Sequence, residues 1–157
     1  MPELRLNERL NERIVTRRLV LRPLETADAD AIDTLCSRDR EIVRWLTGMP
    51  WPAKDGAAAE FVAAAINEDP LTGEAAFAVT LGGILIGLVA VKAPGDLADH
   101  PDCPSLGYWI GRPFQGFGYA GEAAAAALGW GFAAHDCKAM AARAFADNAA
   151  SLKVLHR

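Results

Sequence analysis

The sequence predicts one domain of the mixed α/β (α+β) class, in which helices flank a central sheet. Three observations support this prediction. Patterns typical of strands alternate with patterns typical of helices, two apolar runs flank a Gly-Gly pair, and a later strand pattern leads through glycines into a long helix pattern. With 157 residues, of which 52% are hydrophobic, the chain can bury a core of ordinary size. No linker divides the chain, so we expect residues 1–157 to form a single domain.

The first third of the chain predicts one strand followed by helices. After an N-terminal arm at residues 1–13, apolar residues in the stretch 13–24 indicate a strand that Pro23 ends. Apolar residues at helical spacing then predict three helices, the first with Thr26 or Asp28 as its N-cap. The three expected helices cover residues 25–37, 40–48 and 57–69.

The rest of the chain predicts a hairpin, two further strands and two helices. The apolar runs around Gly82-Gly83 indicate the hairpin, because a Gly pair suits the tight turns that join antiparallel strands. The last helix would begin at Asp147 or Asn148. The expected elements are the hairpin at 75–91, strands at 105–111 and 138–145, and helices at 119–135 and 147–157.

Charge and composition exclude several classes of protein. The net charge is −4, and no basic block indicates nucleic-acid binding. The polar N-terminus lacks the apolar segment of a signal peptide, and no apolar run is long enough to span a membrane. The cysteines are odd in number, which favours a reducing cytoplasm, and the histidines lack the spacing of metal ligands. These residues are Cys36, Cys103 and Cys137, and His100, His135 and His156.

Four glycines within eleven residues separate the strand expected at 105–111 from the helix expected at 119–135. A glycine-rich turn before a helix gathers free backbone N–H groups and the positive end of the helix dipole, which together bind anions such as phosphate. No Lys-Ser or Lys-Thr of a P-loop follows, and the Gly-x-Gly-x-x-Gly pattern from Gly116 lies too late in the chain for a dinucleotide-binding fold. The alternative is a tight connection that binds no ligand.

The stretch Gln-Gly-Phe-Gly-Tyr-Ala at 115–120 resembles the Q/R-x-x-G-x-G/A signature of the GNAT N-acetyltransferases. The sequence around it is similar to the RimJ/RimL-type branch, whose members acetylate N-terminal amines of ribosomal proteins and other amines. The resemblance runs from about Val15 to His156. The stretches that carry it are 16–32, 49–62, 106–123 and 147–155.

The resemblance implies a mixed, mostly antiparallel sheet with an acetyl-CoA site between two splayed strands, at 106–111 and 138–145. The pantetheine would lie in this gap and pair with strand backbone, and the pyrophosphate would bind the amides of 116–121. No metal is implied. The implied coenzyme-binding residues are Trp109, Ile110, Gly111, Gln115, Gly116, Phe117, Gly118, Tyr119, Ala120, Gly121 and Asn148.

Two residues of the last expected helix match catalytic positions of the family. Asn148 matches an asparagine that contacts the pantetheine or its sulfur end, and Ser151 matches a serine proposed to protonate the leaving thiolate. Each also has a simpler interpretation, Asn148 as a helix cap and Ser151 as a surface residue of the first turn.

The general base is where the chain departs from the family pattern. Many members carry a glutamate just before the central strand, where this chain has Ser105 or Leu106. Glu74 and Asp102 are alternatives, as bases or as solvated loop carboxylates. Three aromatic residues have two alternative roles, contact with the acceptor or packing in the core. They are Tyr108, Trp45 and Trp51.

The family pattern continues with two more strands beyond the point where this chain ends, at Arg157. From the resemblance we expect missing C-terminal strands and an uncovered edge at 138–145, which a homodimer or a longer natural chain would cover. The function expected is acetyl transfer from acetyl-CoA to a primary amine, with a protein N-terminus as the first candidate. The alternative is a non-catalytic acyl-CoA-binding or regulatory module on the same fold.

Overall fold

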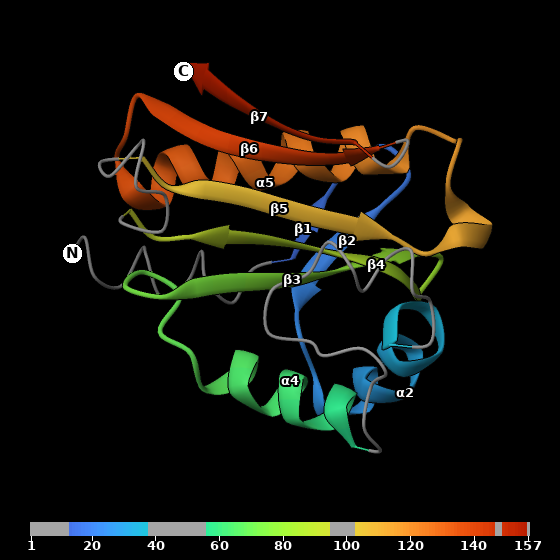
Figure 1. Ribbon diagram of the computed structural model, residues 1–157. Coiled ribbons are helices and arrows are strands. Elements are labelled where there is room, and N and C mark those ends of the chain that lie inside the picture. Colours follow the sequence, from blue (N-terminus) through green and yellow to red (C-terminus); the bar gives the residue numbers. More distant parts are fainter. Residues whose placement is uncertain (1–12, 38–55, 95–102, 147–148, 157) are drawn as a thin grey trace.

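The computed structural model describes residues 13–37, 56–94, 103–146 and 149–156, and the thirteen residues 142–146 and 149–156 are described by backbone alone. Seven strands form one sheet in the order β1-β2-β3-β4-β5-β6-β7, so each strand lies beside its neighbours in the sequence (Figure 1). All neighbouring strands are antiparallel except β5 and β6, which are parallel. The expected mixed, mostly antiparallel sheet is confirmed.

The N-terminal segment forms two short strands, β1 (Ile14–Val15) and β2 (Val20–Pro23), so the single strand expected over 13–24 is wrong. The polar residues between the two apolar runs make a turn, in which the Thr16 N–H donates to the Leu19 carbonyl at 2.8 Å. The chain therefore reverses at the point where the apolar pattern is interrupted, and β1 pairs antiparallel with β2.

The helix expected over 25–37 is confirmed as a continuous helical segment made of η1 (Thr26–Asp28), α2 (Ala29–Ile32) and η2 (Asp33–Ser37). Its N-cap is Glu25, whose N–H donates to the Asp28 carboxylate at 2.8 Å. Thr26 is therefore inside the first turn, and Asp28 closes the capping box from within rather than starting the segment.

The helix expected over 57–69 is confirmed as α4 (Ala57–Asn67), which ends before Pro70. The helix expected over 40–48 and the N-terminal arm up to residue 12 lie outside the described residues.

The hairpin is confirmed as β3 (Glu74–Leu81) and β4 (Ile84–Lys92). Gly82 and Gly83 form its turn with φ of 58° and 83°. Both glycines have a left-handed backbone, which a tight hairpin turn requires and glycine adopts at little cost.

The strand–loop–helix unit is also confirmed. It comprises β5 (Ser105–Ile110), a short turn η3 (Arg112–Phe114) and helix α5 (Tyr119–His135). The strand β6 (Ala139–Ala146) follows, in agreement with the strand expected over 138–145.

The helix expected over 147–157 is wrong, because residues 149–156 form the strand β7 (Ala149–His156). β7 pairs antiparallel with β6 along its whole length, from Ala146↔Ala149 to Ala139↔His156. Only Asp147 and Asn148 connect the two strands, and a two-residue connection of this composition is typical of a hairpin. Because β7 covers β6, the expectation of an uncovered edge there is wrong, and so is the argument for a partner that completes the sheet at β6.

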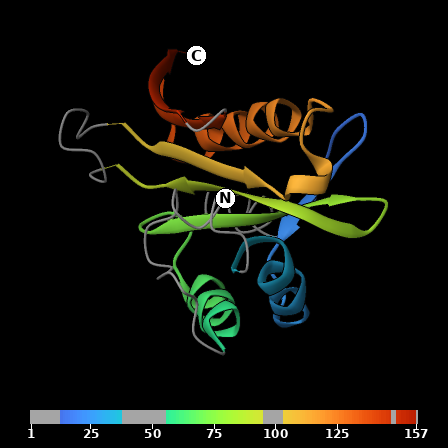
Figure 2. The same ribbon diagram turned by 45° about the vertical axis from the view of Figure 1, so that its right-hand side comes forward.

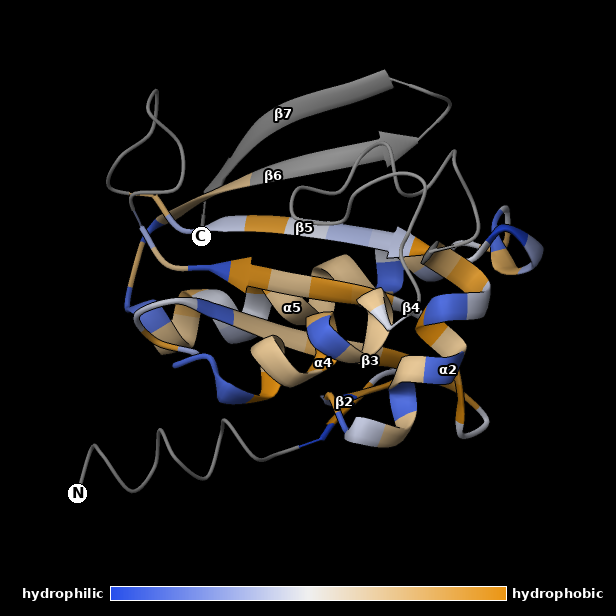
Figure 3. Ribbon diagram, turned by 60° about the horizontal axis from the view of Figure 1, so that its bottom comes forward, coloured by the Kyte–Doolittle hydropathy of each residue, from blue (hydrophilic) through white to orange (hydrophobic). Residues whose placement is uncertain are grey.

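Helix α5 covers one face of the sheet, and α2 and α4 cover the other (Figure 2). Apolar residues are concentrated along β3 and β4, between these helices (Figure 3). The core on the α5 face includes Leu21, Phe77, Val79, Ile86, Leu106, Trp130 and Met140, and the core on the other face includes Ile32, Val62, Ala78, Leu88 and Trp109. In the part of the chain that the structure describes, no helix has the length and apolar character to cross a membrane.

Candidate active site

The parallel strands β5 and β6 pair only over the first two residues of β5. Their ladder contains the pairs Ser105↔Ala141 and Leu106↔Ala142, and the Ala141 N–H donates to the Pro104 carbonyl at 2.9 Å. The ladder ends there, although β5 continues to Ile110 and β6 to Ala146. The two strands are therefore unpaired over the C-terminal part of β5, so the expected splay of the central sheet is confirmed.

The splay leaves one edge of β5 without a strand partner. The Gly111 N–H donates to the Ile86 carbonyl at 2.8 Å, and hydrogen-bonded pairs alternate along an antiparallel ladder. The amide groups of Trp109 therefore face β4, whereas those of Tyr108 and Ile110 face the gap beside β6. Gln115 Nε2 donates to the Ile110 carbonyl at 2.8 Å, so this carbonyl already has a partner. The groups left for an extended ligand are the Tyr108 amide and carbonyl and the Ile110 N–H.

Glycines shape the loop between β5 and α5. Gly116 and Gly118 have φ of 87° and 83°, and Gly118 is the N-cap of α5. A Cβ added at Gly116 or Gly121 would meet no atom within 4 Å, so the backbone there borders open space. The first intrahelical bond of α5 runs from the Glu122 N–H to the Gly118 carbonyl, at 3.2 Å.

The helix start therefore provides donors for an anion. The N–H groups of Tyr119, Ala120 and Gly121 have no acceptor within the helix. They lie at the positive end of the helix dipole, beside the open space along the glycines. The residues expected to bind phosphate are thus brought together with free donors and room for a ligand, which fits a pyrophosphate group.

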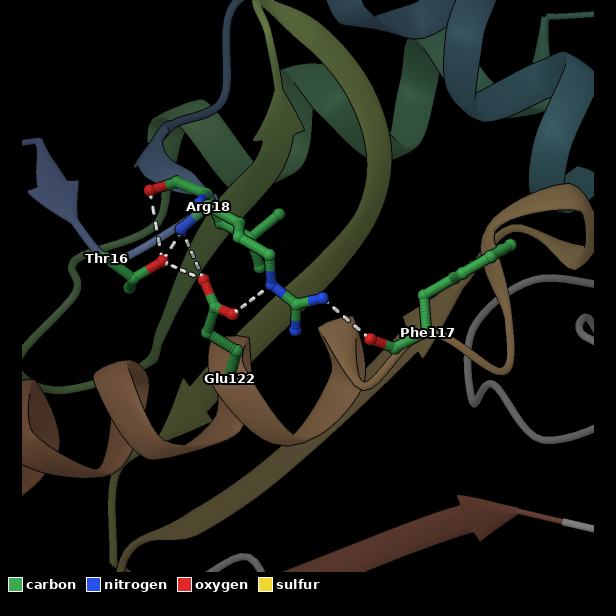
Figure 4. A network of polar contacts seen from close by, with 5 residues as sticks. Thr16, Arg18, Phe117 and Glu122 are labelled. Carbon is green, nitrogen blue, oxygen red and sulfur yellow. Dashed lines mark hydrogen bonds and ion pairs between the residues drawn. The ribbon is translucent and has the colours of Figure 1, made fainter.

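A polar network joins this loop to the turn between β1 and β2 (Figure 4). The Glu122 carboxylate accepts hydrogen bonds from the Thr16 hydroxyl and from the Arg18 N–H at 2.8 Å, and it pairs with Arg18 Nε at 2.7 Å. Arg18 Nη1 donates to the Phe117 carbonyl at 2.8 Å. The Thr16 hydroxyl first and Arg18 second lower the pKa of Glu122 to about 2, so this carboxylate is ionised at neutral pH.

Sequence reasoning did not identify Thr16 or Arg18. The contacts between Arg18 and Glu122 span 104 residues of the chain, and no spacing rule connects positions so far apart. The one signal in the sequence was Glu122, the acidic residue in the first turn of the expected helix. A glutamate at this position suggests a positively charged partner, but the sequence does not show which residue it is.

Other expected residues lie at the opposite end of β5. Ser105 is buried at the start of the strand, in register with Lys92, and Lys92 pairs with Glu74 Oε2 at 3.8 Å. Glu74 is therefore on β3, with β4 between it and β5. Tyr108 is half-buried and packs against the core on the α5 face.

The C-terminal candidates are only partly described. Ser151 lies in β7 opposite Ala144, so β6 runs between Ser151 and β5. The remaining candidates, Trp45, Trp51, Asp102 and Asn148, lie outside the described residues. Among the residues that are described, no group of three or more His, Cys, Asp or Glu side chains is placed to hold a metal ion.

A GNAT acetyltransferase domain matches residues 18–157 of the chain. The chain belongs to the GNAT acetyltransferase family. It is therefore an acetyl-CoA-dependent acetyltransferase. Of the two functions left open by the sequence, the family favours the enzyme over the non-catalytic module.

Solved GNAT structures share this fold. A candidate ribosomal-protein-serine acetyltransferase from Vibrio cholerae is 24% identical, with a TM-score of 0.69 over 88% of this chain and 76% of that chain. Mycobacterium smegmatis RimJ, solved with a CoA-disulfide, is 22% identical, with a TM-score of 0.64 over 83% and 64%. RimL, a ribosomal L7/L12 α-N-protein acetyltransferase, is 17% identical, with a TM-score of 0.67 over 84% and 71%. A search of curated proteins finds no match.

Proposed function

We propose that this GNAT enzyme acetylates a primary amine, and that the N-terminal amine of a protein is its acceptor. The observation that carries the proposal is the splay of β5 from β6 directly before a glycine loop and a helix N-terminus. The shared fold with RimL, which acetylates the α-amine of ribosomal L7/L12, supports a protein N-terminus as the acceptor.

The coenzyme is held mainly by backbone groups in this proposal. The N–H groups of residues 116–121 bind the pyrophosphate, and the open edge of β5 at Tyr108 and Ile110 pairs with the pantetheine amides. Trp109 and Gly111 support this edge from behind, because the Trp109 side chain packs in the core and the Gly111 N–H is bound to Ile86. Gln115 fixes the end of the strand through its bond to the Ile110 carbonyl.

The chemistry requires three protein functions. The attacking amine must lose a proton to a base or a base-held water, the tetrahedral oxyanion needs an N–H donor, and the thiolate benefits from a proton donor. The Tyr108 and Ile110 N–H groups face the gap and are the oxyanion donors in this proposal. From the family resemblance, Ser151 is the candidate proton donor and Asn148 a further pantetheine contact. Ser151 lies on β7, with β6 between it and β5, so its role in this proposal has no support from the strand order. Holding both substrates in the gap provides much of the rate.

We place the enzyme in the cytoplasm, where ribosomal proteins are made. The thiols support this location, because none of Cys36, Cys103 and Cys137 forms a disulfide in the described structure. The homodimer stays a proposal. An uncovered β6 edge would have supported it, but β7 pairs with β6.

The test is an acetyl-CoA consumption assay with paired acceptors. One peptide has a free N-terminus and no lysine, its partner has a blocked N-terminus and one lysine, and small amines complete the set. We expect turnover with the free N-terminus and background rates with the blocked peptide. Turnover only on lysine or small amines would refute the protein N-terminus as acceptor, and coenzyme binding without turnover on any amine would support the non-catalytic module.

A further inference from the structure

We propose that Arg18 is a coenzyme-binding residue, which fixes the phosphate loop through the Phe117 carbonyl and offers its remaining Nη2 group to a phosphate oxygen of CoA. The proposal rests on the proposed coenzyme site. It adds a side chain from the β1–β2 turn to a site otherwise made of backbone from β5 and α5.

The position of the guanidinium carries the proposal. Nε pairs with Glu122 at 2.7 Å and Nη1 donates to the Phe117 carbonyl at 2.8 Å, which leaves Nη2 as the outer donor of the fork. Nη2 lies 3.3 Å from the place that a Cβ on Gly118 would occupy. Gly118 is the N-cap of α5, so Nη2 lies beside the N-terminus of this helix, where the anion should bind.

The bond to the Phe117 carbonyl has a consequence for the loop. Phe117 lies between Gly116 and Gly118, both with a left-handed backbone. A carbonyl oxygen would repel a phosphate, and a carbonyl bound to Arg18 cannot turn toward one. Arg18 therefore favours the loop conformation that presents N–H groups to the ligand before the ligand arrives, which reduces the entropy lost on binding.

Contacts of Glu122 and of the Tyr119 ring hold the guanidinium in this place. Glu122 accepts from both the Arg18 backbone N–H and Nε, and the Thr16 hydroxyl donates to the same carboxylate (Figure 4). The guanidinium carbon lies 4.6 Å from the centroid of the Tyr119 ring. A planar fork with several donors can serve Glu122, Phe117 and a phosphate together, which a lysine ammonium cannot do with the same geometry.

A purely structural role is the competing explanation. The pair is partly exposed, and exposed ion pairs contribute little to stability. A structural role would make Arg18 variants less stable but would not make their coenzyme affinity depend on the phosphates. The experiment therefore compares a ligand with phosphates and a ligand without them.

The experiment measures dissociation constants for CoA by calorimetry, and for pantetheine by displacement, with Arg18→Met and the matched control Arg17→Met. Arg17 is exposed on the same turn, so its variant removes the same charge without the network. We expect Arg18→Met to weaken CoA binding about 10-fold or more, as for the loss of charge-assisted hydrogen bonds, and to leave pantetheine binding unchanged. Arg17→Met should retain the wild-type affinity for both.

Arg18→Lys is the second variant, in case Arg18→Met does not fold. It keeps the charge and removes the fork, so we expect CoA binding to be weaker than in the wild type. Wild-type CoA affinity in either Arg18 variant, or equal losses for CoA and pantetheine, would overturn the proposal. A wild-type protein that does not bind CoA would instead refute the coenzyme site itself, so the two failures are distinguishable.

Discussion

Two arginines of the N-terminal segment, four residues apart, bind carboxylates in different surroundings. Arg22 makes two hydrogen bonds of 2.8 Å to Asp28, six residues away, and the two side chains are 14% and 7% exposed. Arg18 pairs with Glu122, which is 104 residues away, and these side chains are 40% and 17% exposed. The first pair is local and buried beside the start of the helical segment. The second is more exposed, mainly through Arg18, and reaches the β5–α5 loop.

The surroundings determine what each pair does. Burial would raise the pKa of Asp28, but the hydrogen bonds from Arg22 and the Glu25 N–H and the charge of Arg22 outweigh it and lower the pKa. Asp28 also closes the capping box of the helical segment. The Arg22–Asp28 pair thus serves stability, because Asp28 without Arg22 would be a buried charge without its ion-pair partner. The Arg18–Glu122 pair positions a loop, and its effects should appear in binding before they appear in stability.

The largest effect on stability is expected from Arg22→Met. It leaves the Asp28 carboxylate buried without its partner, which typically costs about 3–5 kcal/mol of unfolding free energy. Urea unfolding measures this loss, and calorimetry with CoA should show an unchanged affinity in the folded protein. Adding Asp28→Asn should restore part of the stability, since the amide is neutral and its oxygen can still accept the Glu25 N–H. A stable Arg22→Met protein with weakened CoA binding would reverse the two roles.

The next effect concerns the loop that the Arg18 pair supports. Gly118 and Gly83 both have φ of 83°, one at the start of α5 and the other in the β3–β4 turn. A valine at either position adopts an unfavourable left-handed backbone, at about 1–2 kcal/mol. Gly118→Val should also weaken CoA binding by about 100-fold, because several charge-assisted hydrogen bonds to phosphate are lost.

Gly83→Val is the control for backbone strain. It should lose similar stability and keep its coenzyme affinity, because a Cβ added at Gly83 would meet no atom within 4 Å and Gly83 is not part of the β5–α5 loop. Calorimetry with CoA on both folded variants measures the difference. Equal CoA affinities in the two variants would contradict the phosphate-loop assignment.

Ser151→Ala separates coenzyme binding from catalysis. If Ser151 protonates the thiolate, its loss should lower kcat by about 100-fold and leave the affinity for acetyl-CoA unchanged. Steady-state kinetics with the best acceptor amine and calorimetry with CoA measure the two quantities. Full activity in Ser151→Ala would remove this residue from the mechanism, in agreement with the intervening strand β6.

Local patterns predicted most of the fold. The Gly82-Gly83 hairpin and helix α5 depend on residues close together in the sequence, and both were correct in place and type. The glycine signature likewise predicted the loop at the start of α5. The prediction of a single N-terminal strand was wrong, because the polar residues from Thr16 to Arg18 form a turn between two apolar runs.

The last element was wrong for a different reason. Asp147 and Asn148 suit a helix cap as well as a two-residue turn, and the residues that follow do not distinguish a helix from a strand. Pairing with β6 decides in favour of the strand, and pairing is a tertiary property. The same limit explains Arg18, since its contacts with Glu122 and Phe117 join segments about a hundred residues apart.

The smallest expected effect is the pH dependence of stability, which depends on the exposure of the two ion pairs. The network lowers the pKa of Glu122 from an ordinary 4.5 to about 2. The ionised carboxylate therefore stabilises the folded state fully at pH values above 4.5. This stabilisation is lost as the pH falls from 4.5 toward the lowered pKa of about 2. Wild type should therefore be slightly more stable than Glu122→Gln at neutral pH, and the difference should vanish as the pH approaches 2. Because the comparison is between two proteins that both contain Asp28, the acid sensitivity of Asp28 cancels.

The salt dependence of stability is a second measurement that compares the two ion pairs. At about 1 M salt, charges that are open to solvent are screened within about 3 Å, whereas buried pairs are screened much less. Added salt should therefore reduce the stability difference between wild type and Glu122→Gln, and should leave the difference between wild type and Arg22→Met nearly unchanged. Urea midpoints of the three proteins at low and high salt measure both differences. If salt affected the two differences equally, exposure would not be what separates the pairs, and the division between a stabilising pair and a positioning pair would be wrong.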